Sequence, residues 1–355
     1  MIIIEFILVF GLLLFIHEFG HFIFAKLFKI GVEEFGFGFP PRLAKIGKYK
    51  ETEITLNWIP FGAFVRLSGE EDPEVPGGYG QASPFARFMT LMGGPLFNLV
   101  LGIGIFTVIF MRLGIPDLKT VQVFDVSPNS PAEAAGIEAG DIILSVENEE
   151  IQNTDKLASK IKENQGKEIS IVLLKPSGET KQIQAIPRTD PPPGEGYLGF
   201  TMSNPYRSAA WYEAVPYAFQ ATGNYAYTLI TLPGKLIQGS VSAEEARPVG
   251  PVGIFSIYSQ ARERDVENTT SENPADRLNT LLILAIISVA LGFTNLLPIP
   301  ALDGGRIILL LPEILFRKRV PPKYENMINL VGFVALLALM VIITTMDILK
   351  PVVMP

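Results

Sequence analysis

The 355-residue sequence contains no cysteine and only two histidines. Without cysteine the chain forms no disulfide, and any metal must be held by histidine, aspartate, glutamate or asparagine. Charged residues are also scarce, because they make up 18% of the chain against 48% hydrophobic residues. The net charge of −7 and the lack of a basic block argue against nucleic-acid binding. This composition favours a membrane protein.

Both histidines fall within five residues, His17-Glu18-Phe19-Gly20-His21, and these five lie inside an apolar stretch. The pattern HExxH places two imidazoles on one face of a helix with a carboxylate beside them, as in zinc peptidases. The structural alternative is a pair of buried histidines that hydrogen-bond Glu18, but three such groups in a bilayer helix are hard to satisfy without a metal. The sequence therefore predicts a metalloprotease whose active site lies in the bilayer.

Four segments are long and apolar enough to cross a bilayer, which takes about 20 residues. They lie at roughly 2–25, 88–112, 279–299 and 327–348. The first has no basic region before it and no small-residue cleavage site, so we expect a retained helix instead of a signal peptide. The predicted fold class is a polytopic α-helical membrane protein with about four transmembrane helices.

The placement of lysine and arginine predicts the orientation of these helices. The loops at 26–87 and 305–325 both carry clustered basic residues, so both should face the cytoplasm. The termini and the long 113–278 insert then face outward. This topology places His17 and His21 near the cytoplasmic end of the first helix.

The 26–87 loop alternates apolar and aromatic residues with glycines, which indicates short strands and hairpins. Non-helical backbone at membrane depth survives only where it is buried in protein or lines a cavity. The edge of such a membrane-associated β-hairpin loop could pair with an extended substrate. The alternative is a cytoplasmic hairpin that caps the helix bundle.

The remaining segments divide between a soluble module and an amphipathic stretch. Strand and helix patterns after the second helix predict an inserted α+β domain, and the aromatic-rich segment that follows resembles interfacial helices. The predicted domains are 1–112 with the HExxH helix, the β-loop and the second helix, 113–202 with the soluble module, 203–273 with the interfacial segment, and 274–355 with the C-terminal membrane core.

A zinc site needs a third protein ligand and an open position for water. With cysteine and further histidines absent, that ligand must be a carboxylate or an amide, and the best candidate is Asp303 within the sequence NLLPIPALDGGR. Two prolines and two glycines mark non-helical backbone there, and the predicted topology puts Asp303 on the same side as His17 and His21. Glu18 would polarise the attacking water and carry its proton to the leaving amine.

Two asparagines are the remaining polar candidates within the apolar segments. Asn295 could donate to the substrate carbonyl or the developing oxyanion, and Asn98 is a second candidate for substrate binding. The alternative for both is hydrogen bonding between helices, a common use of asparagine in membranes.

The HEFGH motif, the NLLPIPALDGG motif, the sequence GPxxN at 94–98 and an inserted PDZ-like module together resemble the site-2 protease family of intramembrane zinc metalloproteases. The likeness is greatest to the bacterial regulator-of-sigma-E protease branch. It implies Zn2+ bound by His17, His21 and Asp303, with Glu18 as catalytic base and the 26–87 loop holding the substrate extended. It also implies a multi-pass protein of the bacterial inner membrane.

The same resemblance implies single-pass membrane proteins as substrates, cut within transmembrane segments after trimming on the outer side. Anti-sigma factors and signal-peptide remnants are examples. The PDZ-like domain would act as a size filter, and Leu198, Gly199 and Phe200 resemble its carboxylate-binding strand. Gram-negative members of this branch carry two tandem PDZ domains, whereas only one can be placed here.

Two other functions fit parts of the pattern. A catalytically inactive PDZ membrane scaffold would keep the architecture, but the intact His17, Glu18, His21 and Asp303 argue against it. A metal transporter would need a second set of coordinating residues along a path, and the sequence offers one compact set.

Overall fold

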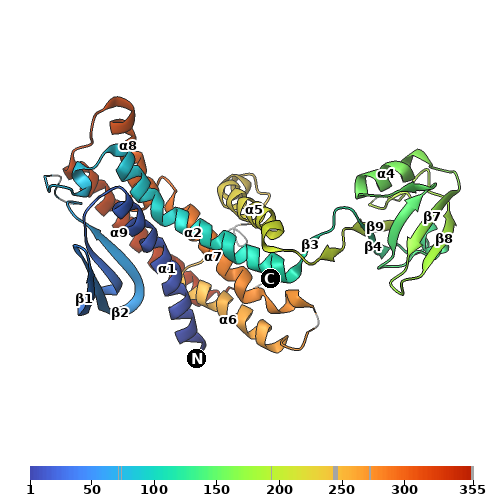
Figure 1. Cartoon of the computed structure of the whole chain (residues 1–355), viewed down its shortest axis with the longest axis horizontal. Helices are drawn as coiled ribbons and strands as arrows, with labels where there is room; N and C mark the ends of the chain where they lie inside the picture. The colour runs from blue at the N-terminus through green and yellow to red at the C-terminus, as the bar shows by residue number, and fades with distance from the viewer. Residues whose placement is uncertain (71, 73, 193, 243–246, 272, 353–355) are drawn as a thin grey trace. The chain divides into compact units, whose positions relative to one another are not determined.

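The computed structural model describes residues 1–70, 72, 74–192, 194–242, 247–271 and 273–352. The chain divides into two compact units (Figure 1). Unit 1 combines Met1–Phe110 with Ala214–Pro355, and unit 2 is Met111–Glu213. Residues 243–246 and 272 of the predicted interfacial segment lie outside the described residues.

Unit 1 is built mainly from helices: α1 (Ile2–Leu27), α2 (Pro84–Leu113), α5 (Trp211–Ile237), α6 (Pro251–Glu267), α7 (Asn279–Asn295), α8 (Asp303–Phe316) and α9 (Pro322–Leu349). Within the described residues, α1, α2 and α9 are each long and apolar enough to cross a membrane. This confirms the prediction of a membrane protein. The apolar helix α7 has 17 residues, which is shorter, so the fourth span stays a prediction.

The segment after α7 differs from the predicted loop at 305–325, because residues 303–316 form helix α8. The helix α7 ends at Asn295, and Pro298 and Pro300 then lack the amide hydrogens that a helix needs. Asp303 is the first residue of α8, where a carboxylate complements the positive end of the helix dipole. Asp303 therefore begins a new helix after the break.

The helices α1 and α2 cross where Gly20 meets Gly93. A Cβ atom built on Gly93 would lie 2.6 Å from the Gly20 carbonyl oxygen, and one on Gly20 would overlap the Gly93 carbonyl. Small residues at a helix crossing let the two backbones touch, which is how helices pack tightly in membranes. This crossing brings α2 against the face of α1 that carries the histidines.

We expect Gly20→Ala to destabilise unit 1 by about 1–3 kcal/mol, since the added methyl group must push two backbones apart. Thermal unfolding of the full chain in detergent measures this loss. Gly104→Ala on α2 is the control, because a Cβ atom there meets nothing within 4 Å. Equal melting temperatures for the two variants would contradict the close crossing.

The β-containing region consists of two long strands, β1 (Val32–Tyr49) and β2 (Thr52–Leu67), where short strands were predicted. Residues 32–37 of β1 pair with two stretches of β2, 53–56 and 63–67. Residues 42–49 of β1 pair with 52–57 of β2. The region is thus a sheet of four rows in the order 42–49, 52–57, 32–37 and 63–67. Among the pairs that the structure describes, the outer row 63–67 is paired on one side only.

A hydrophobic cluster joins the sheet to three helices. It includes Ala25 of α1, Val32 and Leu67 of the sheet, Leu91 of α2 and Leu310 of α8, all of which are buried. Burial of such side chains contributes roughly 1.5–3 kcal/mol each for the larger ones. The cluster therefore holds the sheet, α1, α2 and α8 together next to the candidate site.

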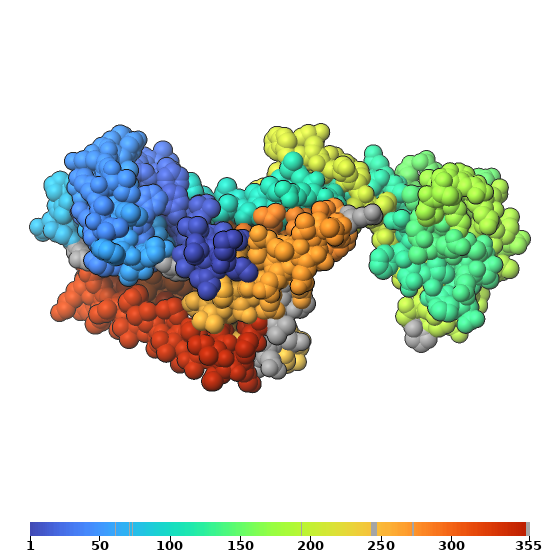
Figure 2. Space-filling model, turned by 90° about the horizontal axis from the view of Figure 1, so that it is seen from below, coloured from blue at the N-terminus to red at the C-terminus, as the bar shows by residue number. Residues whose placement is uncertain are grey.

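The helix α6 lies beside both α9 and the N-terminal part of α1, as Figure 2 shows. The buried Asp347 near the end of α9 accepts hydrogen bonds from the Gly250 and Gly253 amides, each at 2.9 Å, and so caps the N-terminus of α6. Farther along α6, the Tyr258 hydroxyl donates to Glu5 of α1 at 2.9 Å.

Unit 2 is a mixed α+β unit with strands β3 (Ile115–Pro116), β4 (Val121–Val126), β5 (Ile142–Val146), β6 (Glu149–Glu150), β7 (Ile169–Leu174), β8 (Thr180–Ala185), β9 (Phe200–Ser203) and β10 (Tyr206–Arg207), and helices α3 (Pro131–Ala134) and α4 (Thr154–Glu163). Its main sheet has the order β8-β7-β5-β4-β9, with β6 on β5. A cavity of about 390 Å³ is lined by Ile161 of α4 and by Leu198 and Phe200.

Candidate active site

The helix α1 presents His17 and His21 from the same face, because residues four apart lie one turn above each other. Their Nε2 atoms are 3.2 Å apart, and the two rings are nearly perpendicular. Both side chains are largely buried, with 10% and 12% of their surface exposed. Two nitrogen donors therefore converge on one point within an apolar helix.

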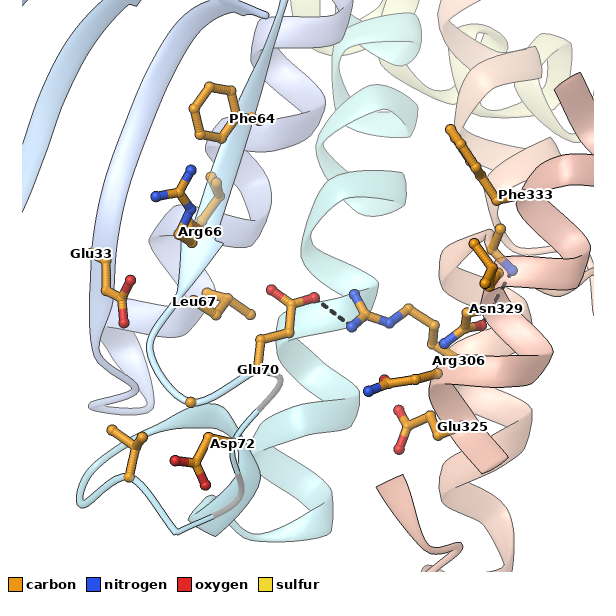
Figure 3. A pocket seen from close by; sticks show the side chains of 16 residues that line it. Glu33, Phe64, Arg66, Leu67, Glu70, Asp72, Arg306, Glu325, Asn329 and Phe333 are labelled. Atoms are coloured by element: carbon orange, nitrogen blue, oxygen red, sulfur yellow. Dashed lines mark hydrogen bonds and ion pairs between the residues drawn. The ribbon is translucent and has the colours of Figure 1, made fainter. Parts of the chain in front are cut away.

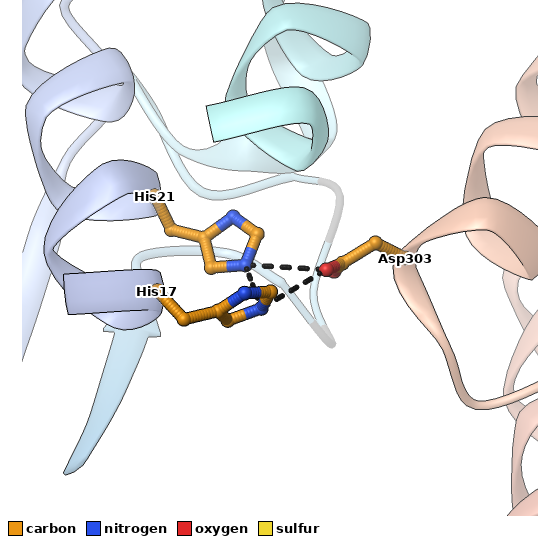
Figure 4. Close-up of side chains that lie close together, drawn as sticks. All are labelled: His17, His21 and Asp303. Atoms are coloured by element: carbon orange, nitrogen blue, oxygen red, sulfur yellow. Dashed lines mark hydrogen bonds and ion pairs between the residues drawn. The ribbon is translucent and has the colours of Figure 1, made fainter. Parts of the chain in front are cut away.

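Asp303 reaches the same point from α8 (Figure 4). Its Oδ2 atom lies 3.2 Å from His17 Nε2 and 3.4 Å from His21 Nε2. The predicted set of His17, His21 and Asp303 is thus brought together from segments almost 300 residues apart. Among the residues that the structure describes, these three form the one group of histidine and carboxylate side chains that lie close enough together to hold a metal ion.

The tautomer of the neutral His21 ring shows why this cluster suits a cation. The His21 Nδ1 atom lies 2.8 Å from the Thr90 carbonyl oxygen, which can only accept, so Nδ1 must donate and a neutral ring keeps its lone pair on Nε2. That lone pair faces the Asp303 carboxylate, whose buried Oδ2 has no hydrogen bond among the described residues. Acceptors that face one another need a positive charge between them.

The spacing of the three atoms also fits zinc. A tetrahedral site with ligand bonds of about 2.0 Å has ligand atoms about 3.3 Å apart. The observed separations are 3.2, 3.2 and 3.4 Å. His17, His21 and Asp303 could therefore hold a zinc ion without rearrangement and leave one position open.

Glu18 lies next to the first histidine and contacts the sheet. Its Oε2 atom accepts a hydrogen bond of 3.2 Å from the Val65 amide. Val65 belongs to the outer row 63–67 of the sheet. The carboxylate is therefore placed between the histidine cluster and the edge of a β-sheet.

Asn98 lies behind His17 on α2, fully buried, and its amide nitrogen is 3.3 Å from His17 Nδ1. Its backbone carbonyl accepts a hydrogen bond from the Ser288 hydroxyl of α7 at 2.7 Å. The side chain thus touches a predicted ligand, and its role in substrate binding stays a prediction.

The other predicted residues lie outside this cluster. The Asn295 side-chain amide donates to the Leu291 carbonyl one turn earlier at 3.0 Å, so it is engaged by its own helix. Leu198, Gly199 and Phe200 lie in unit 2, where Leu198 and Phe200 are buried and Gly199 has a φ of +76°. Their predicted roles are untested.

Thr90 and Val65 at the site were not singled out from the sequence, and Gly94 was named only as part of the GPxxN motif, without a role at the site. The first two act through backbone atoms, which leave no trace in residue type. Gly94 is different, because a Cβ atom there would lie 2.6 Å from His17 Nε2 and closer still to His21 Nε2. A glycine pair followed by proline in an apolar helix was the available signal for such a close approach.

We expect Gly94→Ala to weaken zinc binding roughly 10–100-fold, the size typical of changes beside a metal site, since the methyl group displaces both imidazoles. Competition against a chelator, with the purified full chain in detergent, measures the zinc affinity. Gly104→Ala on the same helix is the control and should bind zinc like the wild type. Unchanged affinity in Gly94→Ala would argue against zinc at these two nitrogens.

The apolar helices, the HExxH helix and the converging carboxylate together define a metallopeptidase of the membrane. The family model described as peptidase family M50 matches residues 5–339. The chain belongs to this family, the site-2 proteases, as its motifs predicted.

The relatives carry matching names. A Clostridium perfringens protein provisionally named as a zinc metalloprotease is 33% identical, over 98% of both chains. Zinc metalloprotease RasP of Oceanobacillus iheyensis is 28% identical, again over 98% of both. A protease named eep of Enterococcus faecalis is 26% identical with the same coverage. The chain is thus a zinc-dependent membrane protease with bacterial relatives.

Proposed function

We propose that this enzyme cuts peptide bonds within the transmembrane segments of single-pass membrane proteins. The substrates would be proteins already trimmed on the outer side, such as anti-sigma factors and signal-peptide remnants, so the enzyme acts in regulated intramembrane proteolysis. The observation that carries this proposal is the hydrogen bond from Val65 to Glu18, which sets a sheet edge beside the catalytic base.

In this proposal His17, His21 and Asp303 hold the zinc ion. When bound there, zinc acidifies a water molecule and polarises the scissile carbonyl. The Thr90 carbonyl holds His21 with its Nε2 atom toward the site. The Asn98 side-chain amide, whose nitrogen lies 3.3 Å from His17 Nδ1, would do the same for His17 by turning its oxygen to this atom, because a ring that gives Nε2 to a metal carries its proton on Nδ1.

Glu18 serves as the general base. It follows His17 directly in the helix, so its carboxylate lies beside the cluster while the two imidazoles fill the ligand positions. The carboxylate accepts a proton from the attacking water and then gives it to the leaving amine. Glu18 is half-buried, which limits the access of bulk water to that proton.

The outer row 63–67 would hold the substrate in extended form by strand addition. A cavity of about 970 Å³ runs along this row (Figure 3). Its walls are residues 64–67 on one side and Arg306, Asn329 and Phe333 of α8 and α9 on the other. A strand placed there would lie beside Val65, whose amide bonds Glu18, and the strand's amides and carbonyls could pair with the other edge groups of the row. Asn295 remains the candidate donor to the oxyanion.

The proposed topology places four spans in the bacterial inner membrane, with α7 as the fourth. The sheet and the active site lie toward the cytoplasm, as the basic residues of 26–87 indicate. Residues 113–202 form an outward PDZ-like domain that excludes bulky substrates, and 203–273 lies at the membrane interface. The cavity lined by Leu198 and Phe200 is the candidate peptide groove of that domain.

We expect Glu18→Gln to keep its zinc and to lose cleavage by at least ~10²-fold, because the amide cannot take the proton. Cleavage of a single-pass reporter by the full chain in liposomes measures the loss, and zinc per chain checks the site. Glu51→Gln, a change at an exposed glutamate in the β1–β2 turn, is the control. A wild type that binds zinc yet cuts no trimmed reporter would favour the inactive scaffold.

We also expect a glycine or proline near the cut site to speed cleavage of a helical reporter. Helical carbonyls are engaged in internal hydrogen bonds, so the segment must unwind before it can join the sheet edge. Cleavage rates for matched reporters with Leu or Gly at one position measure the effect. Equal rates would count against strand addition.

A further inference from the structure

Two arginines outside the metal site share one tyrosine. Arg87 of α2 has 2% of its surface exposed, and Arg306 belongs to α8. Both guanidinium groups lie over the Tyr79 ring, at 6.0 and 5.9 Å from its centroid. Burial raises the pKa of the Tyr79 phenol, so the ring stays neutral beside the two cations. Such a site costs desolvation energy and needs charged partners.

Each arginine has one acidic partner. Arg87 pairs with Glu313 of α8, and Arg306 pairs with Glu70, as the dashed line in Figure 3 shows. Arg87 therefore ties α2 to α8. The Glu70–Arg306 pair instead joins α8 to the loop that follows the outer row of the sheet.

That loop is in turn fixed to the end of α1. The Ser68 amide donates to the Gly31 carbonyl at 2.9 Å, and the Gly31 amide donates to the Gly77 carbonyl at 3.0 Å. The Tyr79 amide donates to the Ser68 carbonyl at 2.7 Å, which closes the loop on itself. Glu70, two residues after Ser68, is thus anchored through the backbone to the segment that follows the helix of His17 and His21.

Arg306 is three residues after Asp303, so the two side chains leave neighbouring positions on one face of α8. Asp303 needs such an anchor, because the non-helical residues 296–302 precede it. Its carboxylate must lie within a few tenths of an ångström of the right place to complete a tetrahedral site.

We propose that Glu70 and Arg306 are a positioning pair that sets the place of Asp303 relative to His17 and His21. This inference rests on the ligand set of the proposed function. The pair also connects the outer row of the sheet, which would bind the substrate, to the helix of the third ligand. The row and Asp303 therefore keep a fixed position relative to each other. Arg306 acts through Asp303 and not on the reacting atoms.

The test is a double-mutant cycle on zinc affinity with Glu70→Gln, Arg306→Gln and the double variant. Zinc is the only probe, in chelator competition with the full chain in detergent. Each single variant should bind zinc 10–100-fold more weakly, the range for residues that orient metal ligands. The double variant should lose no more than the worse single one, since both changes remove the same restraint.

Glu51→Gln is the matched control, because its ion pair with Lys26 joins the β1–β2 turn to α1 and does not involve α8. It should bind zinc like the wild type. Melting temperatures measured with and without zinc separate positioning from general stability. Glu70→Gln should reduce the rise in melting temperature that zinc gives, and this reduction should exceed the fall in melting temperature of the zinc-free chain.

Wild-type zinc affinity in Glu70→Gln and Arg306→Gln would overturn the inference. If these variants keep their zinc affinity but show a raised KM for reporter cleavage, the pair contacts the substrate instead. Additive losses in the double variant would also overturn the inference. A separate variant, Asp303→Ala, tests the ligand set itself. If that variant keeps zinc, the proposed site fails, whereas zinc lost there but kept in Glu70→Gln rejects the positioning pair alone.

Discussion

The structure depends on one electrostatic constraint: two imidazole nitrogens and a carboxylate oxygen meet in a buried, apolar place. The three atoms lie 3.2 to 3.4 Å apart, and the Thr90 carbonyl fixes the His21 lone pair toward the other two. A cation satisfies all three at once. The close crossing of Gly20 with Gly93, the missing side chain at Gly94 and the break before α8 all serve to bring these atoms together.

A second constraint comes from the proposed substrate. A transmembrane helix hides its peptide bonds in internal hydrogen bonds, so a protease must offer other partners before it can cut. The outer row 63–67 offers backbone groups on its free side, and the Val65 amide shows where this edge stands relative to Glu18. The proposed catalytic base and the candidate docking edge are thus joined by a single hydrogen bond.

Much of the site could be predicted from residue type alone. HExxH stands out within an apolar segment, and Asp303 followed because cysteine and further histidines are absent and because it comes after an apolar segment broken by prolines and glycines. The long helices α1, α2 and α9 also followed from hydropathy, since length and composition decide whether a helix can span a bilayer.

Other features depend on tertiary contacts and could not be read in this way. Residues 305–325 were predicted as a loop between two apolar spans, yet 303–316 form α8, which buries Leu310 in the shared core. The double pairing of residues 32–37 depends on register, which the alternating pattern leaves open. Arg87 and Arg306 were counted as loop charges, whereas both lie over Tyr79.

The most direct test is zinc X-ray absorption on the purified, detergent-solubilised chain, beside the zinc content of Asp303→Ala. Our account predicts about one zinc per wild-type chain, with two imidazoles and oxygen ligands at about 2.0–2.2 Å, and a sharp loss of zinc in the variant. A wild-type spectrum with fewer than two imidazoles, or full zinc content in Asp303→Ala, would contradict it.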